Sequence, residues 1–138
     1  MLMQPLKDIK LVHLHSALTT GQATTSVAGN VVDMAGFEGA LVIGTVGNNT
    51  TVGVKLTVQN GTSTTVFNTT CGTVSTTAKN GIFAFEVVKP TMRYLRTLLD
   101  STAESCTGGV IAILYGAHVQ PTTQASTDLL ANTSYTST

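Results

Sequence analysis

The scarcest feature of this chain is charge. Asp, Glu, Lys and Arg make up 10% of its 138 residues, against about 25% in a typical domain. Seven basic and seven acidic residues cancel to a formal net charge of +0. Binding to nucleic acid needs clustered Lys and Arg, which displace counterions from the phosphates, and no basic stripe is present. We therefore expect no nucleic-acid partner.

Long apolar runs are also lacking, since none reaches the roughly 18 residues that a membrane-spanning helix needs. The opening residues, Met-Leu-Met-Gln-Pro-Leu-Lys, do not show the basic and then apolar order of a secretory signal. We expect a protein made in a cytoplasm, with no membrane partner. Cysteine is scarce, and Cys71 and Cys106 match no metal-binding spacing. Two free thiols are expected, with a disulfide as the alternative.

Threonine is abundant instead, with 26 residues. Thr is β-branched and polar, so it can cover the outer face of a strand without adding charge. Such a surface suits contact with other protein, whereas a freely diffusing monomer usually carries more charge. The length is that of one domain, which can bury about two thirds of the surface that its unfolded chain exposes.

Several segments carry strand patterns. Apolar and polar residues alternate at Val52–Gln59. At Ile82–Val88, Phe83, Phe85 and Val87 alternate with Ala84, Glu86 and Val88, which is the period-two pattern of a strand with one face inward. Segments 92–99 and 108–119 are apolar at nearly every position, which is typical of strands that are buried on both faces or lie in a subunit contact. Pro90 separates the first of these late strands from the second. We expect these last three strands to be neighbours in one sheet.

Other strands are predicted at 11–18, 23–35, 40–46 and 62–70, with a kink or turn at Gly29-Asn30. Asn60-Gly61 is the strongest local signal for a tight hairpin, and residues 71–80 resemble a loop. About eight short strands with frequent turn signals predict an all-β fold, an antiparallel β-sandwich that is jelly-roll-like.

The sandwich is expected to span residues 11–119, between an extended N-terminal arm at 1–10 and an extended C-terminal arm at 120–138. A short helix is possible at Thr127–Ala131. The C-terminal arm is mostly polar, and it takes a defined position only if another surface offsets its ordering entropy. We expect that surface to belong to a neighbouring subunit, with contacts from the large side chains Leu129, Leu130 and Tyr135.

Chemically reactive residues form no recognisable site. His13 and His15 are two positions apart on a strand, so they should share a face and could both reach one metal ion. Without a third ligand nearby, we expect them, and His118, to face solvent or an interface. The seven carboxylates are scattered, and no nucleophile, phosphate-binding or dinucleotide motif occurs. We expect no catalysis, cofactor or metal.

Arg93 and Arg96 flank Tyr94 on a predicted strand. An exposed Arg on a sheet often anchors a partner by forking onto a carboxylate or stacking on an aromatic ring. The alternative is a solvated charge. The candidate partner-binding residues are therefore Arg93, Arg96, His13, His15, Leu129, Leu130 and Tyr135.

Five segments together resemble a known family. They are the strand–turn–strand Val32–Leu41, the alternating Val54–Gln59, Met92–Arg96, Thr107–Ala112 and His118–Pro121. In this arrangement the chain resembles the small capsid decoration, or cement, proteins of tailed bacteriophages. The resemblance covers roughly two thirds of the chain and rests on turn residues and apolar strands.

The resemblance implies a β-sandwich that assembles as a homotrimer on the outer surface of an icosahedral head. There it would bind the major capsid protein and stabilise the contacts between its copies. Related sandwiches occur in tails, head fibres and spikes, so a module that binds host-surface carbohydrate is the alternative. The supply of aromatic residues for such a module is thin, with no Trp and three Tyr.

Overall fold

The computed structural model describes residues 5–17, 26–47, 53–101, 107–119 and 122–129. Almost all regular structure in these ranges is β, and no helix among them is long and apolar enough to cross a membrane. In chain order the elements are α1 (Pro5–Asp8), β1 (Lys10–His15), β2 (Val27–Ala28), β3 (Val32–Asp33), β4 (Gly39–Val46), β5 (Val54–Gly61), β6 (Thr69–Thr76), β7 (Gly81–Val88), β8 (Tyr94–Ser101) and β9 (Thr107–Tyr115).

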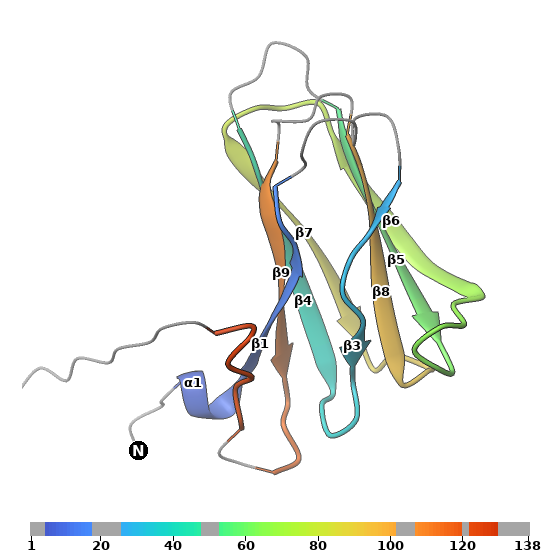
Figure 1. The fold of residues 1–138 in the computed structure, drawn as a ribbon, viewed down its shortest axis with the longest axis vertical. Coiled ribbons are helices and arrows are strands. Elements are labelled where there is room, and N and C mark those ends of the chain that lie inside the picture. Colours follow the sequence, from blue (N-terminus) through green and yellow to red (C-terminus); the bar gives the residue numbers. More distant parts are fainter. Residues whose placement is uncertain (1–4, 18–25, 48–52, 102–106, 120–121, 130–138) are drawn as a thin grey trace, which may run out of the picture.

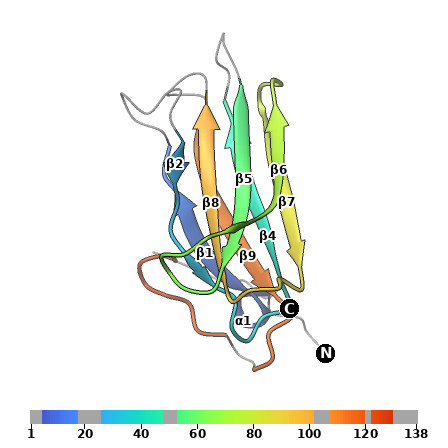
Figure 2. The same cartoon turned by 90° about the vertical axis from the view of Figure 1, so that its right-hand side faces the viewer.

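The strands form two antiparallel sheets packed face to face (Figure 1). One sheet has the order β1-β9-β4-β7, and the other has the order β2-β8-β5-β6 with β3 also paired to β8. Figure 2 shows the five-stranded sheet in front of the four-stranded one. If β2 and β3 are counted as one interrupted strand, the order is that of a jelly roll. The predicted all-β, jelly-roll-like sandwich is confirmed.

The expectation that the last three strands are neighbours in one sheet is wrong. β7 and β9 flank β4 in the four-stranded sheet, whereas β8 lies in the other sheet between β2 and β5. In a jelly roll, connections repeatedly cross from one sheet to the other, so strands that follow each other in sequence are mostly separated in space. Sequence order alone carries no signal for this crossing.

The core lies between the sheets and is built by alternation along each strand. In β5, Val54, Leu56 and Val58 are fully buried, as their apolar period predicts, while Lys55 is exposed. β8 also alternates, since Leu95, Thr97, Leu99 and Ser101 point inward. Segment 92–99 is therefore not buried on both faces, although its outward side chains are half-buried.

The tight hairpin predicted at Asn60-Gly61 is wrong. Both residues belong to β5, where they pair with β8, and Asn60 is buried with its Nδ2 donating to Thr91 Oγ1 at 2.9 Å. Most of the strand predicted at 62–70 is instead a connection, because residues 62–68 lead from β5 to β6. β6 itself occupies most of the segment expected to be a loop. Pairing on both sides of β5 outweighs the local turn preference of Asn-Gly.

The kink predicted at Gly29-Asn30 is present and connects the two sheets. The N–H of Gly29 donates to Thr97 O in β8 at 2.9 Å, and the N–H of Asn30 donates to Leu14 O in β1 at 3.0 Å. Asn30 Nδ2 also donates to His13 O at 2.9 Å. The interrupted strand β2–β3 thus closes one side of the sandwich, where β1 and β8 would otherwise be open.

The C-terminal segment 122–129 lies along the free edge of β1 (Figure 1). Gln124 Oε1 accepts from the N–H of Leu11 at 2.9 Å, and Asp128 Oδ1 accepts from the N–H of His13 at 3.0 Å. We expected a neighbouring subunit to support the C-terminal arm. Residues 122–129 of this arm instead lie on β1 of the same chain. Residues 126–128 form a turn, so Thr127 and Asp128 are not in the helix considered for 127–131, of which residues 130 and 131 lie outside the described residues. Pro5–Asp8 form one helical turn in the arm expected to be extended.

Candidate interaction surface

The outer surface of the four-stranded sheet is apolar. Residues directly opposite on neighbouring strands share a face, and the register places Leu11, Ile113 and Leu41 in one row across β1, β9 and β4. The next row joins Ile111, Ile43 and Ala84. We name as the apolar face the outward side chains of Leu11, Leu41, Ile43, Ile82, Ala84, Val88, Ile111 and Ile113.

Three members of the apolar face are exposed large side chains. Ile82 is 73% exposed, Val88 62% and Ile111 41%, whereas Leu41, Ile43 and Ile113 are half-buried. Single exposed apolar residues are common on soluble proteins, but a contiguous apolar sheet surface marks an interaction site. The apolar face is therefore the first candidate for contact with another protein.

One end of the apolar face is closed by a tyrosine that reaches across a strand. The Tyr115 hydroxyl in β9 donates to Glu86 Oε1 in β7 at 2.6 Å. Its ring crosses β4 at Gly39, where a Cβ would overlap the ring. The hydrogen bond to Glu86 raises the pKa of Tyr115 to about 12. Glu86 is the one carboxylate among the outward residues described for this sheet, and it is already engaged within the chain.

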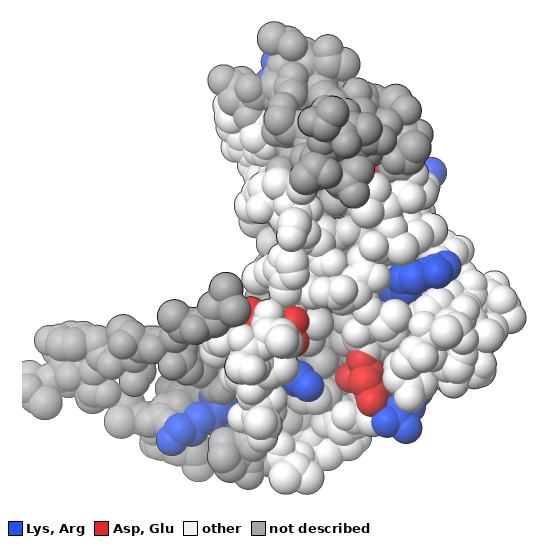
Figure 3. All heavy atoms as spheres, viewed as in Figure 1, with Lys and Arg blue, Asp and Glu red and all other residues white. Residues whose placement is uncertain are grey.

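The outer surface of the other sheet is polar. Lys55, Thr57 and Gln59 of β5 lie beside Thr73 and Ser75 of β6, and Thr57 Oγ1 is 3.3 Å from Thr73 Oγ1. Charge is sparse over the molecule as a whole, and most of the described surface in Figure 3 is neither basic nor acidic. The two outer surfaces therefore differ in chemistry, and the apolar one is the better interface.

A β-bulge sends the two candidate histidines of β1 to opposite faces. His13 is opposite the outward Ile111, but His15 is opposite the buried Val110, because the register shifts between them. The expectation that both share a face is wrong, and together they do not form a pair of metal ligands on one surface. A bulge adds one residue and resets the alternation.

His15 is buried in the core, where it is 5% exposed. Its Nε2 lies 2.7 Å from Thr97 Oγ1, and a Cβ on Gly29 would come within 2.5 Å of the same nitrogen. Burial first, and then the nearby His13, lower the pKa of His15 from 6.5 to about 4. The ring is therefore neutral at pH 7 and joins β1 to β8 through Thr97.

The two candidate arginines are engaged within the chain. Arg93 forks onto Asp33, with Nε donating to Oδ1 at 2.9 Å and Nη2 to Oδ2 at 2.8 Å. This hydrogen bond lowers the pKa of Asp33. Arg96 donates to Gln59 Oε1 at 2.7 Å, and its guanidinium lies 4.5 Å from the centre of the Phe67 ring. Whether either residue also contacts a partner stays a prediction.

The remaining candidates belong to the C-terminal arm. Leu129 is half-buried beside the turn, and its N–H donates to Ala125 O at 2.9 Å. Leu130 and Tyr135 lie outside the described residues, as does Cys106. Cys71 is a free, exposed thiol in β6. Among the candidates that lie in described residues, His13 is joined to the segment of Leu129 along the edge of β1, and His13 and His15 both line one hollow.

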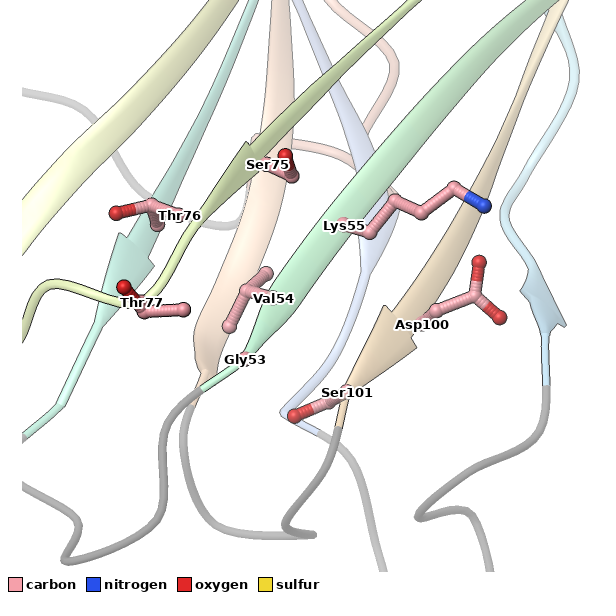
Figure 4. Close-up of a pocket in the computed structure, with 8 residues that line it drawn as sticks. All are labelled: Gly53, Val54, Lys55, Ser75, Thr76, Thr77, Asp100 and Ser101. Atoms are coloured by element: carbon pink, nitrogen blue, oxygen red, sulfur yellow. The ribbon is translucent and has the colours of Figure 1, made fainter.

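A hollow of about 560 Å³ lies at one end of the sandwich, between β5, β6 and β8. Figure 4 shows its lining, in which Ser75 and Thr76 come from the end of β6, Thr77 follows that strand, and Lys55 and Asp100 extend to the same side of the sheet. A second hollow, of about 450 Å³, lies where His13 and Ile43 meet Gly109. Within the described ranges, His, Cys, Asp and Glu form no group of three that could hold a metal ion.

Comparison with known proteins adds no family: no family model matches the chain, and no curated protein matches it. The sequence already carried part of the signal for the apolar face. Segment 108–119 is apolar at nearly every position, which predicts either burial on both faces or a subunit contact. The same signal in β4, at Leu41 and Ile43, is partly hidden because Gly44 and Thr45 interrupt the run.

Proposed function

We propose that this protein is a structural virion component, a decoration protein that binds the outer surface of an icosahedral phage head and stabilises contacts between major capsid protein subunits. The observation that carries the proposal is the contrast between the apolar face and the polar outer surface of the other sheet. Many modest contacts suffice in this role, because a shell presents its binding sites as a fixed array and avidity multiplies their effect.

Two further features support this proposal. The sparse charge removes much of the desolvation penalty that a protein contact would otherwise carry. The jelly roll is also an architecture of viral capsid domains, although it occurs in lectins too, so this support is an analogy of fold. The location of the protein on the virion rests on the family resemblance.

The test is binding of the purified chain to expanded heads that lack it, measured by co-sedimentation and by electron microscopy. Ile111→Glu places a charge on the apolar face and should weaken binding at least tenfold, because a carboxylate would be desolvated in the contact. Thr73→Glu introduces the same side chain at an exposed position of the polar surface and should bind as the wild type does. No binding by the wild type, or equal binding by both variants, contradicts the proposal.

The alternative is a carbohydrate-binding module on a tail or spike, and the hollow of about 560 Å³ is the observation that favours it. Its lining offers hydroxyls, one Lys and one Asp, which can hydrogen-bond a sugar. None of the described lining residues is aromatic, although ligand sites usually contain aromatic side chains. Specific signals on a glycan array, lost in Asp100→Ala and Thr76→Ala variants, would favour this alternative over decoration.

A further inference from the structure

The edges of the two sheets are protected to very different degrees. An uncovered edge strand presents unpaired backbone groups to other chains, so proteins usually cover, break or charge such edges. The edge of β1 is covered by Gln124 and Asp128 of the C-terminal segment. The edge at β2–β3 is broken by the kink at Gly29-Asn30, whose backbone is bonded to both sheets.

Among the described residues, no segment covers the edge strands β6 and β7, but the pairing of β6 with β5 is interrupted by a register shift at Val58–Gln59. β7 has no such interruption. It runs for eight residues without a break and pairs along its whole length with β4, and no other described strand pairs with it. It contains no Lys and no Pro, and its one charged residue is Glu86. Ile82 and Val88, near its two ends, are 73% and 62% exposed. The neighbouring edge strand β6, by contrast, consists largely of Thr, Ser and Gly.

We propose that β7 pairs antiparallel with β7 of a second copy of this chain, about a two-fold axis at Phe85. In this register Ile82 lies opposite Val88 of the second copy, and Val88 lies opposite its Ile82. The two most exposed apolar side chains of the described residues, apart from Val119, would then cover each other. Cross-strand apolar pairs of this kind are the unit of sheet stabilisation.

The charge of Glu86 favours this register over the two adjacent registers, which are centred on Glu86 and on Ala84. Side chains opposite each other must share a face, so a two-fold pairing has to centre on a residue. Centring on Glu86 sets two carboxylates directly opposite each other, which is destabilising. Centring on Ala84 sets Ile82 against Glu86 of the second copy. Centring on Phe85 instead places Glu86 opposite Ala84, which is small and uncharged.

Such a dimer would join two four-stranded sheets into one continuous sheet, with the apolar face extended across the axis. An isologous contact closes after two copies. It therefore differs from the trimer implied by the family resemblance, and it does not depend on the proposed function. The dimer can form even if the chain does not bind a capsid protein. Binding to a capsid protein can likewise occur even if the dimer does not form.

The first test measures the mass of the purified full chain by light scattering after size exclusion. We expect a dimer for the wild type and a monomer for Ile82→Lys, because a lysine on a sheet edge blocks pairing. Thr73→Lys, at an exposed position of β6, is the matched control and should remain a dimer. Circular dichroism should be the same for all three. The melting temperature of Thr73→Lys should equal that of the wild type, whereas loss of the dimer contact should lower that of Ile82→Lys. A monomeric or trimeric wild type, or a dimer unaffected by Ile82→Lys, overturns the proposal.

The second test fixes the register by disulfide cross-linking in a Cys71→Ser, Cys106→Ser background. The double variant Ile82→Cys, Val88→Cys should form a covalent dimer on oxidation, because the two positions face each other across the axis. Ile82→Cys alone should not, since the two copies of residue 82 would lie about 20 Å apart along the strands. Efficient cross-linking of Ile82→Cys alone, or of Ile82→Cys, Glu86→Cys in preference to the first pair, overturns the register.

Discussion

At the scale of single residues, small side chains decide where the large ones can lie. Gly39 leaves room for the Tyr115 ring to cross β4, and Gly44 does the same for Phe83 on the inner face, where a Cβ would overlap the ring. Gly29 allows the kinked strand to approach His15. Each of these glycines lets two layers of structure meet closely, which is a common reason for glycine within strands.

The buried His15 makes stability depend on pH. Its pKa is about 4 in the folded protein and about 6.5 when unfolded, so the unfolded chain binds the proton more tightly. The free energy of unfolding should therefore fall as pH decreases from about 6.5 to about 4, by up to about 3 kcal/mol from this residue. Urea unfolding of the wild type and of His15→Gln across this range measures the difference.

His15→Gln should flatten the slope between pH 4 and 6.5, whatever its effect on stability at pH 7. His118→Gln makes the same substitution at an exposed histidine and is the matched control. Carboxylates also titrate near the lower end of this range, so the relevant quantity is the difference between the two variants. Equal slopes in both variants would show that His15 is not buried in its neutral form.

At the scale of elements, the side chains of the C-terminal segment replace a missing strand. The N–H groups of Leu11 and His13 point away from β9, and Gln124 and Asp128 accept hydrogen bonds from them. Thr122 adds two more contacts, since its N–H donates to Lys7 O and its Oγ1 to Ile9 O. The segment therefore protects the β1 edge without forming a ladder of its own.

Asp128→Ala should lower the free energy of unfolding by about 1 to 2 kcal/mol, because it removes a charge-assisted acceptor from a partly buried N–H. Amide hydrogen exchange at His13 should become faster in the same variant. Thr123→Ala, an exposed position of the same segment, is the control and should change neither quantity. Unchanged protection of the His13 amide in Asp128→Ala would mean that the segment does not lie on β1.

At the scale of the whole molecule, one core holds both sheets together. Fully buried side chains from β4, β5, β8 and β9 meet in a single cluster, so the sheets should unfold as one cooperative unit. The apolar face lies outside this core, on the opposite side of the four-stranded sheet. β9 is apolar on both of its faces for this reason. Val110, Ala112 and Leu114 point into the core, and Ile111 and Ile113 belong to the apolar face.

Leu56→Asp should prevent folding, because Leu56 is 0% exposed and a carboxylate there would be buried without a partner. Lys55→Asp, one residue earlier on the polar surface, introduces the same side chain and should leave a folded protein. Circular dichroism and the cooperativity of thermal unfolding distinguish the two. A native-like, cooperatively folded Leu56→Asp would refute the inward orientation of β5.

Much of the fold was predictable from local pattern. Alternation located the inward faces of β5 and β7, and the kink at Gly29-Asn30 follows from its turn residues. The errors occurred where pairing partners outweighed local preference. Asn60-Gly61 has the sequence of a tight turn, but it is held in β5 by strands on both sides. The bulge between His13 and His15 likewise depends on β9 and leaves no signal in β1 alone.

The sequence alone determined the class of the fold, because period-two alternation and frequent turn residues are properties of single strands and loops. It also determined the uncharged, threonine-rich character of the surface. Only the tertiary structure decided which apolar residues remain outside the core and which edge stays open. Both depend on the crossing of strands between two sheets, and such crossings join residues that are far apart in the chain.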